Sequence, residues 1–128
     1  MIQETLSQIQ KKIEKTESVK EENKKELLDL LAVLQSEIAQ LSKTDQDHAE
    51  SIIGFASASA HEATRKDRNP DLQKMSLDGF QASVHGFEGS HPKLVEIVNA
   101  ISNALSNLGI LILPILQWRY RNHWNLAF

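Results

Sequence analysis

The chain has 128 residues, 41% of them hydrophobic and 24% charged, with a formal net charge of −3 at pH 7. These values predict one soluble domain with a single modest core, and they argue against nucleic acid as a partner, because nucleic-acid binding depends on basic surfaces. Cysteine is absent, which excludes disulfides, thiolate catalysis and zinc–thiolate sites and suits a reducing cytoplasm.

Two amphipathic helices are expected at the start of the chain. The first has apolar residues at spacings of four, three and four: Ile2, Leu6, Ile9 and Ile13. The second continues the same spacing through Leu27, Leu31, Leu34, Ile38 and Leu41. Ser18 and Glu21 fit a capping box at its start. Because the break between the two helices is short, they are predicted to form an antiparallel hairpin.

A third helix is predicted over residues 48–66, after a polar, acidic link from Ser42 to Asp47. It contains the run Ala56-Ser57-Ala58-Ser59-Ala60. Small side chains of this kind let a neighbouring helix approach closely at little cost in side-chain entropy. Asn69-Pro70 then interrupts the helical pattern.

Two more helices are expected before residue 110. The first is marked by apolar residues at 3-4-3 spacing: Leu77, Phe80, Val84 and Phe87. The second has an apolar stripe from Leu94 to Leu108, with Ser90 as a candidate N-cap and Pro92 in its first turn. The sequence therefore predicts an all-α fold, a small helical bundle with an N-terminal antiparallel helical hairpin, in one domain over residues 1–110.

Residues 111–128 differ in composition and are interpreted as an apolar and aromatic C-terminal tail. The segment from Leu111 to Leu116 is apolar and is interrupted only by Pro114. Both tryptophans and the only tyrosine follow, and Arg119 and Arg121 are the only charged side chains. The tail therefore needs an explanation separate from that of the helical domain.

Two groups of short motifs resemble a bacterial protein family. The first comprises Ala58-Ser59-Ala60-His61-Glu62-Ala63-Thr64-Arg65, Asn69-Pro70 and Ser76-Leu77. The second comprises Gly86-Phe87-Glu88, Ser90-His91-Pro92 and Leu105-Ser106-Asn107-Leu108-Gly109-Ile110. They resemble the domain-of-unknown-function 4404 family over about residues 1–110, and the tail departs from that family. The resemblance implies a small bacterial helical protein, and it brings no known activity, catalytic residue or binding residue.

No residue pattern supports an enzyme, a cofactor or a bound metal. His61-Glu62 begins like the zinc-protease helix motif, but Arg65 stands where that motif needs its second histidine. The simpler interpretation is an exposed helix face on which Glu62 pairs with Lys66. Four histidines could converge in space on a metal, although none lies three or four residues from another: His48, His61, His85 and His91. A small-molecule binder or an enzyme is the third alternative, and the sequence does not identify a ligand for it.

The last predicted helix carries an uncharged polar stripe, formed by Asn99, Asn103 and Asn107 at spacings of four. A solvated helix face normally carries Lys or Glu. Two interpretations remain open, a mild exposed face or a surface that packs against another chain. The candidate interaction surface combines this stripe with four tail residues: Leu111, Leu113, Leu116 and Trp118.

Self-association is the leading functional prediction. The apolar tail, left in water, would form a larger patch than monomers usually tolerate. We expect a structural or protein-interaction module that forms a homo-oligomer, most simply a symmetric dimer. One alternative is a peripheral membrane protein whose tail meets lipid, with Trp118, Tyr120 and Trp124 at headgroup level. Another is that Pro114 folds the tail back onto its own bundle.

Overall fold

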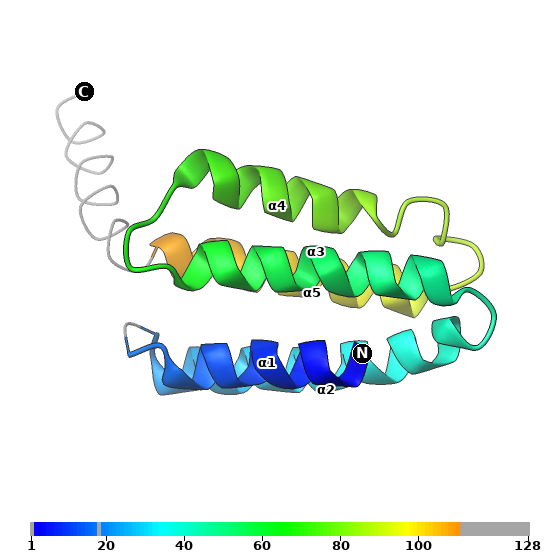
Figure 1. The fold of residues 1–128 in the computed structure, drawn as a ribbon, viewed down its shortest axis with the longest axis horizontal. Helices are drawn as coiled ribbons and strands as arrows, with labels where there is room; N and C mark the ends of the chain where they lie inside the picture. Colours follow the sequence, from blue (N-terminus) through cyan, green and yellow to red (C-terminus); the bar gives the residue numbers. More distant parts are fainter. Residues whose placement is uncertain (1, 18, 111–128) are drawn as a thin grey trace, which may run out of the picture.

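The computed structural model describes residues 2–17 and 19–110 (Figure 1). These residues form five helices: α1 (Ile2–Lys15), α2 (Glu21–Ser42), α3 (Gln46–Thr64), α4 (Pro70–Ala82) and α5 (Pro92–Ile110). No strand occurs in these two ranges, and the predicted all-α fold is confirmed.

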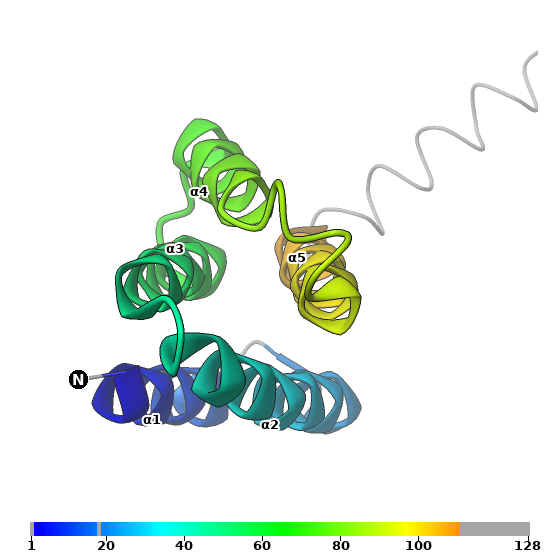
Figure 2. The same cartoon turned by 90° about the vertical axis from the view of Figure 1, so that its right-hand side faces the viewer.

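The helices alternate in direction along the bundle, so that α1, α3 and α5 run one way while α2 and α4 run the other (Figure 1). Viewed along the helices, α1 and α2 form one layer, α3 and α5 form a second, and α4 covers the far side of that second layer (Figure 2). The central helix is α3, which contacts all four others. One consequence is that the C-terminal ends of α1 and α3 lie at the same end of the bundle.

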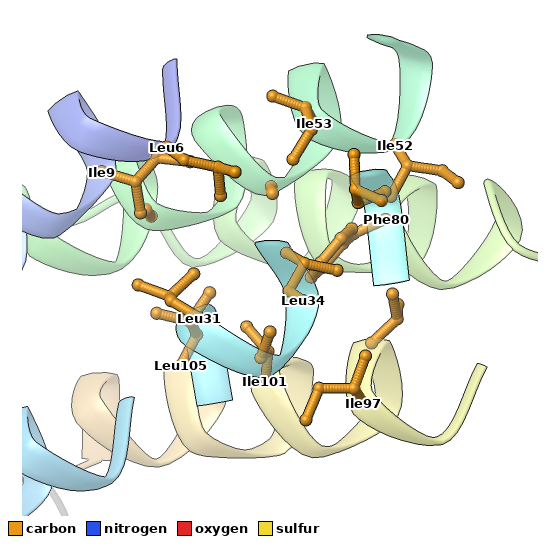
Figure 3. Close-up of a cluster of buried hydrophobic side chains, with 14 of the residues drawn as sticks. Leu6, Ile9, Leu31, Leu34, Ile52, Ile53, Phe80, Ile97, Ile101 and Leu105 are labelled. Carbon is orange, nitrogen blue, oxygen red and sulfur yellow. The ribbon is translucent and has the colours of Figure 1, made fainter. Parts of the chain in front are cut away.

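The core between these layers is almost entirely aliphatic (Figure 3). Its side chains come from every helix, and Leu34, Ile52 and Phe80 are completely buried. The apolar stripes expected on the first two helices are all buried apart from Ile2, which is half-buried: Leu6, Ile9, Ile13, Leu27, Leu31, Leu34, Ile38 and Leu41. Helical spacing therefore located the core side of both helices correctly.

The run of small residues lies on α3 and serves its central position. Ala56, Ser59 and Ala60 are buried, as is Ala63 one turn later, whereas Ala58 is exposed. A helix with neighbours on several sides needs short side chains at its contacts, because interhelical distances of about 8–10 Å leave little room. The predicted close approach is confirmed.

The N-terminal hairpin forms with α1 antiparallel to α2, and α1 also packs against α3. The predicted capping box is wrong. The second helix begins only at Glu21, with Lys20 as an N-cap that makes no side-chain capping bond, and Ser18 lies outside the described residues. The start is delayed because the connecting turn places Val19 in the core, where the side chain is 5% exposed.

The last two helices begin and end at slightly different residues from those expected. Helix α4 ends at Ala82, so Val84 and Phe87 belong to the following turn, although Val84 is buried. Gly86 in that turn has a φ of 93°, a left-handed conformation that glycine adopts without strain, and its N–H donates to Oε2 of Glu88 at 2.8 Å.

Helix α5 begins at Pro92, as expected for proline in a first turn. The residue that precedes its first turn is His91, whose carbonyl oxygen accepts a hydrogen bond from the N–H of Val95 at 3.3 Å. The Ser90 hydroxyl instead lies 3.0 Å from Nδ1 of His91. Ser90 is therefore one residue too early to be the N-cap, and that prediction is wrong.

Candidate functional site

The outer face of α5 carries the three asparagines of the predicted interaction surface. Asn99, Asn103 and Asn107 are all exposed, whereas Ser102 is buried and Ser106 is half-buried. Within the described part of the chain, none of the three side-chain amides has a hydrogen-bond partner. The three amides are therefore free to bind water or another chain.

The four tail residues of that predicted surface have no described position. Leu111, Leu113, Leu116 and Trp118 lie outside the described residues. For the helices that are described, none is long and apolar enough to cross a membrane. The described part of the predicted surface is the α5 face, which we define as Asn99, Asn103 and Asn107.

The four histidines considered as a composite metal site do not converge. His48 and His91 both lie edge-on to the ring of Phe87, with centroid distances of 4.8 and 5.6 Å. His61 is near the other end of α3, about 20 Å from His48 at roughly 1.5 Å per residue. Over residues 2–17 and 19–110, no group of three or more histidines and carboxylates could hold a metal ion.

Glu62 pairs with a different cation from the one expected. Its Oε1 accepts a hydrogen bond from Nη1 of Arg65 at 2.9 Å. Helix α3 ends at Thr64, so Lys66 lies beyond the helix and loses the geometry that brings residues four apart together. The predicted Glu62–Lys66 pair is therefore wrong.

A basic groove lies at the end of the bundle where α1 and α3 both terminate. It has a volume of about 940 Å³. Its cationic side chains come from two segments far apart in the sequence: Lys11, Lys12, Lys15, Arg65, Lys66 and Arg68. Six of the chain's 14 lysines and arginines thus line the groove, with Glu17 as the one carboxylate among its described lining residues.

The tertiary structure brings together two short basic runs that the net charge conceals. One is Lys11-Lys12-Ile13-Glu14-Lys15 and the other is Arg65-Lys66-Asp67-Arg68. Each run alone is an ordinary charged helix end, which is why neither suggested a site. The two basic runs are the sequence signal for the groove. They indicate a site only once it is known that α1 and α3 end side by side.

Polar contacts inside the basic groove leave much of its charge unpaired. Nζ of Lys12 lies 3.0 Å from Nδ1 of His61, so its partner in this contact is an imidazole nitrogen and not a carboxylate. Nη1 of Arg68 is buried and has no hydrogen-bond partner among the described residues. Burial lowers the pKa of Arg68 from its usual value. A basic surface lined by lysine and guanidinium groups is suited to binding anions.

Comparison with known proteins identifies the family. A family model for a domain of unknown function, DUF4404, matches residues 27–110. That range takes in most of α2, all of α3, α4 and α5, the α5 face and the Arg65–Arg68 side of the basic groove. The searches find no match among curated proteins and none among solved structures. The resemblance noted in the sequence is confirmed over this range, and the chain belongs to the DUF4404 family.

Proposed function

We propose that this protein is a non-enzymatic interaction module that self-associates through the α5 face. The observation that carries the proposal is the exposed, uncharged stripe of Asn99, Asn103 and Asn107, whose amides have no partner in the described part of the chain. The basic groove lies on other helices and is not part of this surface.

Symmetry favours an uncharged surface for this role. In a two-fold dimer the same patch meets itself, so a charged stripe would place like charges opposite each other. An asparagine amide both donates and accepts hydrogen bonds, so it can pair with an identical amide. The α5 face is therefore self-complementary in a way that a lysine- or glutamate-bearing helix face is not.

The geometry of α5 also suits a contact between helices. Residues four apart rise by about 6 Å along the axis, so an antiparallel partner helix would place Asn103 opposite Asn103 and Asn99 opposite Asn107. Ala100, Ala104 and Ser106 beside the stripe are half-buried and small. Short flanking side chains allow two helices to approach to about 8 Å.

The mass of the full chain in solution tests this proposal. Light scattering over a range of concentrations is expected to give a dimer that dissociates on dilution. Asn103→Lys should shift the equilibrium to the monomer, because it places two positive charges at the two-fold axis. Gln40→Lys on the exposed side of α2 adds the same charge elsewhere and should leave the dimer intact.

A monomer at every concentration, or a dimer unaffected by Asn103→Lys, would contradict the proposal. A chain ending at Ile110 separates the contribution of the tail from that of the α5 face. The alternative of a peripheral membrane protein depends on residues 111–128. It predicts instead that the full chain binds lipid vesicles and that the shortened chain does not.

A further inference from the structure

The basic groove concentrates positive charge in a chain that is negative as a whole. Six lysines and arginines surround a space of about 940 Å³, and Glu17 is the single carboxylate among the described residues that line it. Glu62 lies nearby but already binds Arg65. Like charges held this close repel one another. A bound anion would relieve that repulsion.

Helix electrostatics account for part of this charge. The C-terminal end of a helix carries a partial negative charge that favours cations in its last turn. Lys12 and Lys15 lie in the last turn of α1, and Arg65 is the C-cap of α3. Lys66 and Arg68 follow the C-cap of α3, and Lys11 precedes the last turn of α1. The groove is therefore more basic than two helix ends require.

Arg68 gives an observation that does not depend on overall charge. Its Nη1 is buried and has no hydrogen-bond partner in the described ranges. Leaving a buried donor of a charged group unsatisfied is costly. The planar guanidinium presents its donors in a fork that matches two oxygens of a phosphate or carboxylate. An oxyanion in the groove can therefore pair with Arg68, which is half-buried and lines the groove.

The size and lining of the basic groove restrict the ligand. Its volume falls in the range of small-molecule sites and far exceeds that of a single phosphate. The cations stand on two sides, three from α1 and three from the segment after α3, so they suit several anionic groups. Apart from His61, no described lining residue offers an aromatic ring for stacking bases, which disfavours single-stranded nucleic acid.

We propose that the basic groove binds a small molecule carrying two or more phosphate groups. Arg68, which is half-buried in the lining, holds one phosphate, and the lysines of α1 neutralise the others. This site is independent of the α5 face, so either proposal can fail while the other stands.

Calorimetric titration of the full chain with inorganic tripolyphosphate tests the proposal. Binding should be measurable at low ionic strength and should weaken as salt is added. Orthophosphate should bind at least about tenfold more weakly, because it engages only one side of the groove. Undetectable binding of tripolyphosphate, or equal affinity for orthophosphate, would overturn the proposal.

Variants assign any binding to the groove. Lys12→Gln with Lys15→Gln should weaken tripolyphosphate binding about tenfold or more. The matched control, Lys25→Gln with Lys93→Gln, removes the same charge from exposed positions outside the groove and should bind like the parent. Equal losses in both pairs would show a general charge effect and overturn the assignment.

Arg68→Gln tests the part that the guanidinium of Arg68 plays in binding. It should abolish most binding while the protein still melts cooperatively. Tripolyphosphate should raise the melting temperature of the parent and not that of this variant, because a ligand stabilises only a state that it binds. Binding unchanged in a folded Arg68→Gln variant would remove Arg68 from the site.

Further arms of the experiment separate the sources of phosphate. Groove-dependent binding to phosphatidylglycerol vesicles that is tighter than that of tripolyphosphate, with none to phosphatidylcholine vesicles, would overturn the small-molecule assignment in favour of a lipid surface, because each of these headgroups carries one phosphate. Binding of tripolyphosphate without binding of either vesicle would identify a free phosphorylated molecule. Groove-dependent binding of duplex or single-stranded RNA that is tighter than that of tripolyphosphate would overturn the small-molecule assignment in favour of nucleic acid.

Discussion

The α5 face and the basic groove are two surfaces of one bundle, of which the first is uncharged and the second is strongly positive. From Ile97 to Ile110, helix α5 has no charged residue, whereas the groove gathers six cations. A surface that meets its own copy is penalised by charge of either sign, and a surface that meets an anion gains from positive charge. The net charge of −3 is the sum over the whole chain and therefore describes neither surface.

The largest expected effect is the loss of stability caused by a substitution in the core, because both surfaces depend on the folded bundle. Leu34 is completely buried in the core, and Leu34→Ala should lower the free energy of unfolding by about 2–5 kcal/mol. Thermal melts measure this loss. Ala32→Ser, at an exposed position on the same helix, should change stability by less than about 0.5 kcal/mol. A melting temperature unaffected by Leu34→Ala would contradict the described core.

Introducing a positive or a negative charge on the α5 face tests whether this face meets its own copy. Asn103→Lys and Asn103→Asp should both weaken self-association, by about tenfold or more, because each repels its own copy across the two-fold axis. Sedimentation or light scattering on a dilution series measures the dissociation constant. Neither variant should change tripolyphosphate binding. Opposite effects of the two charges on association would mean that the α5 face meets a different, charged partner.

Substitutions of two helix N-caps separate a general loss of stability from a local effect on ligand binding in the groove. Oδ1 of Asp45 accepts from the N–H of His48, and Oδ1 of Asn69 accepts from the N–H groups of Asp71 and Leu72. Replacing either cap by alanine should destabilise the protein by about 1 kcal/mol.

Asp45 caps the start of α3 and Asn69 caps the start of α4, and these two helix starts lie at opposite ends of the bundle (Figure 1). Asn69 directly follows Arg68, which lines the basic groove. Asn69→Ala should therefore also weaken tripolyphosphate binding in calorimetry, because it loosens the segment that positions Arg68. Asp45→Ala serves as the control with matched stability and should bind like the parent. Equal binding by both variants would mean that the cap does not position Arg68.

The smallest effect is expected from the acidic residue in the basic groove. Glu17 is exposed and lines the groove, so Glu17→Gln should strengthen tripolyphosphate binding about two- to fivefold, the scale of an exposed charge interaction. Glu22→Gln, on the outer side of α2, is the control and should have no effect. Weaker binding after Glu17→Gln would contradict an anion site.

The sequence by itself determined the helices, the core side of α1 and α2, and the family. Helical periodicity is a local property, so apolar spacings such as that from Leu27 to Leu41 identify a buried face without knowledge of its neighbours. Helix ends were less certain. Ser18 and Ser90 carry the right chemistry for caps, but the core position of Val19 and the turn around Gly86 moved the helix starts.

The basic groove could be identified only from the tertiary structure. Lys11 and Arg68 are far apart in the sequence, and nothing local to either run indicates that they line one space. The alternating directions of the helices place the ends of α1 and α3 together (Figure 1). Placing two charged helix ends side by side is a long-range consequence of packing around α3, whereas the stripe of Asn99, Asn103 and Asn107 could be recognised within a single helix.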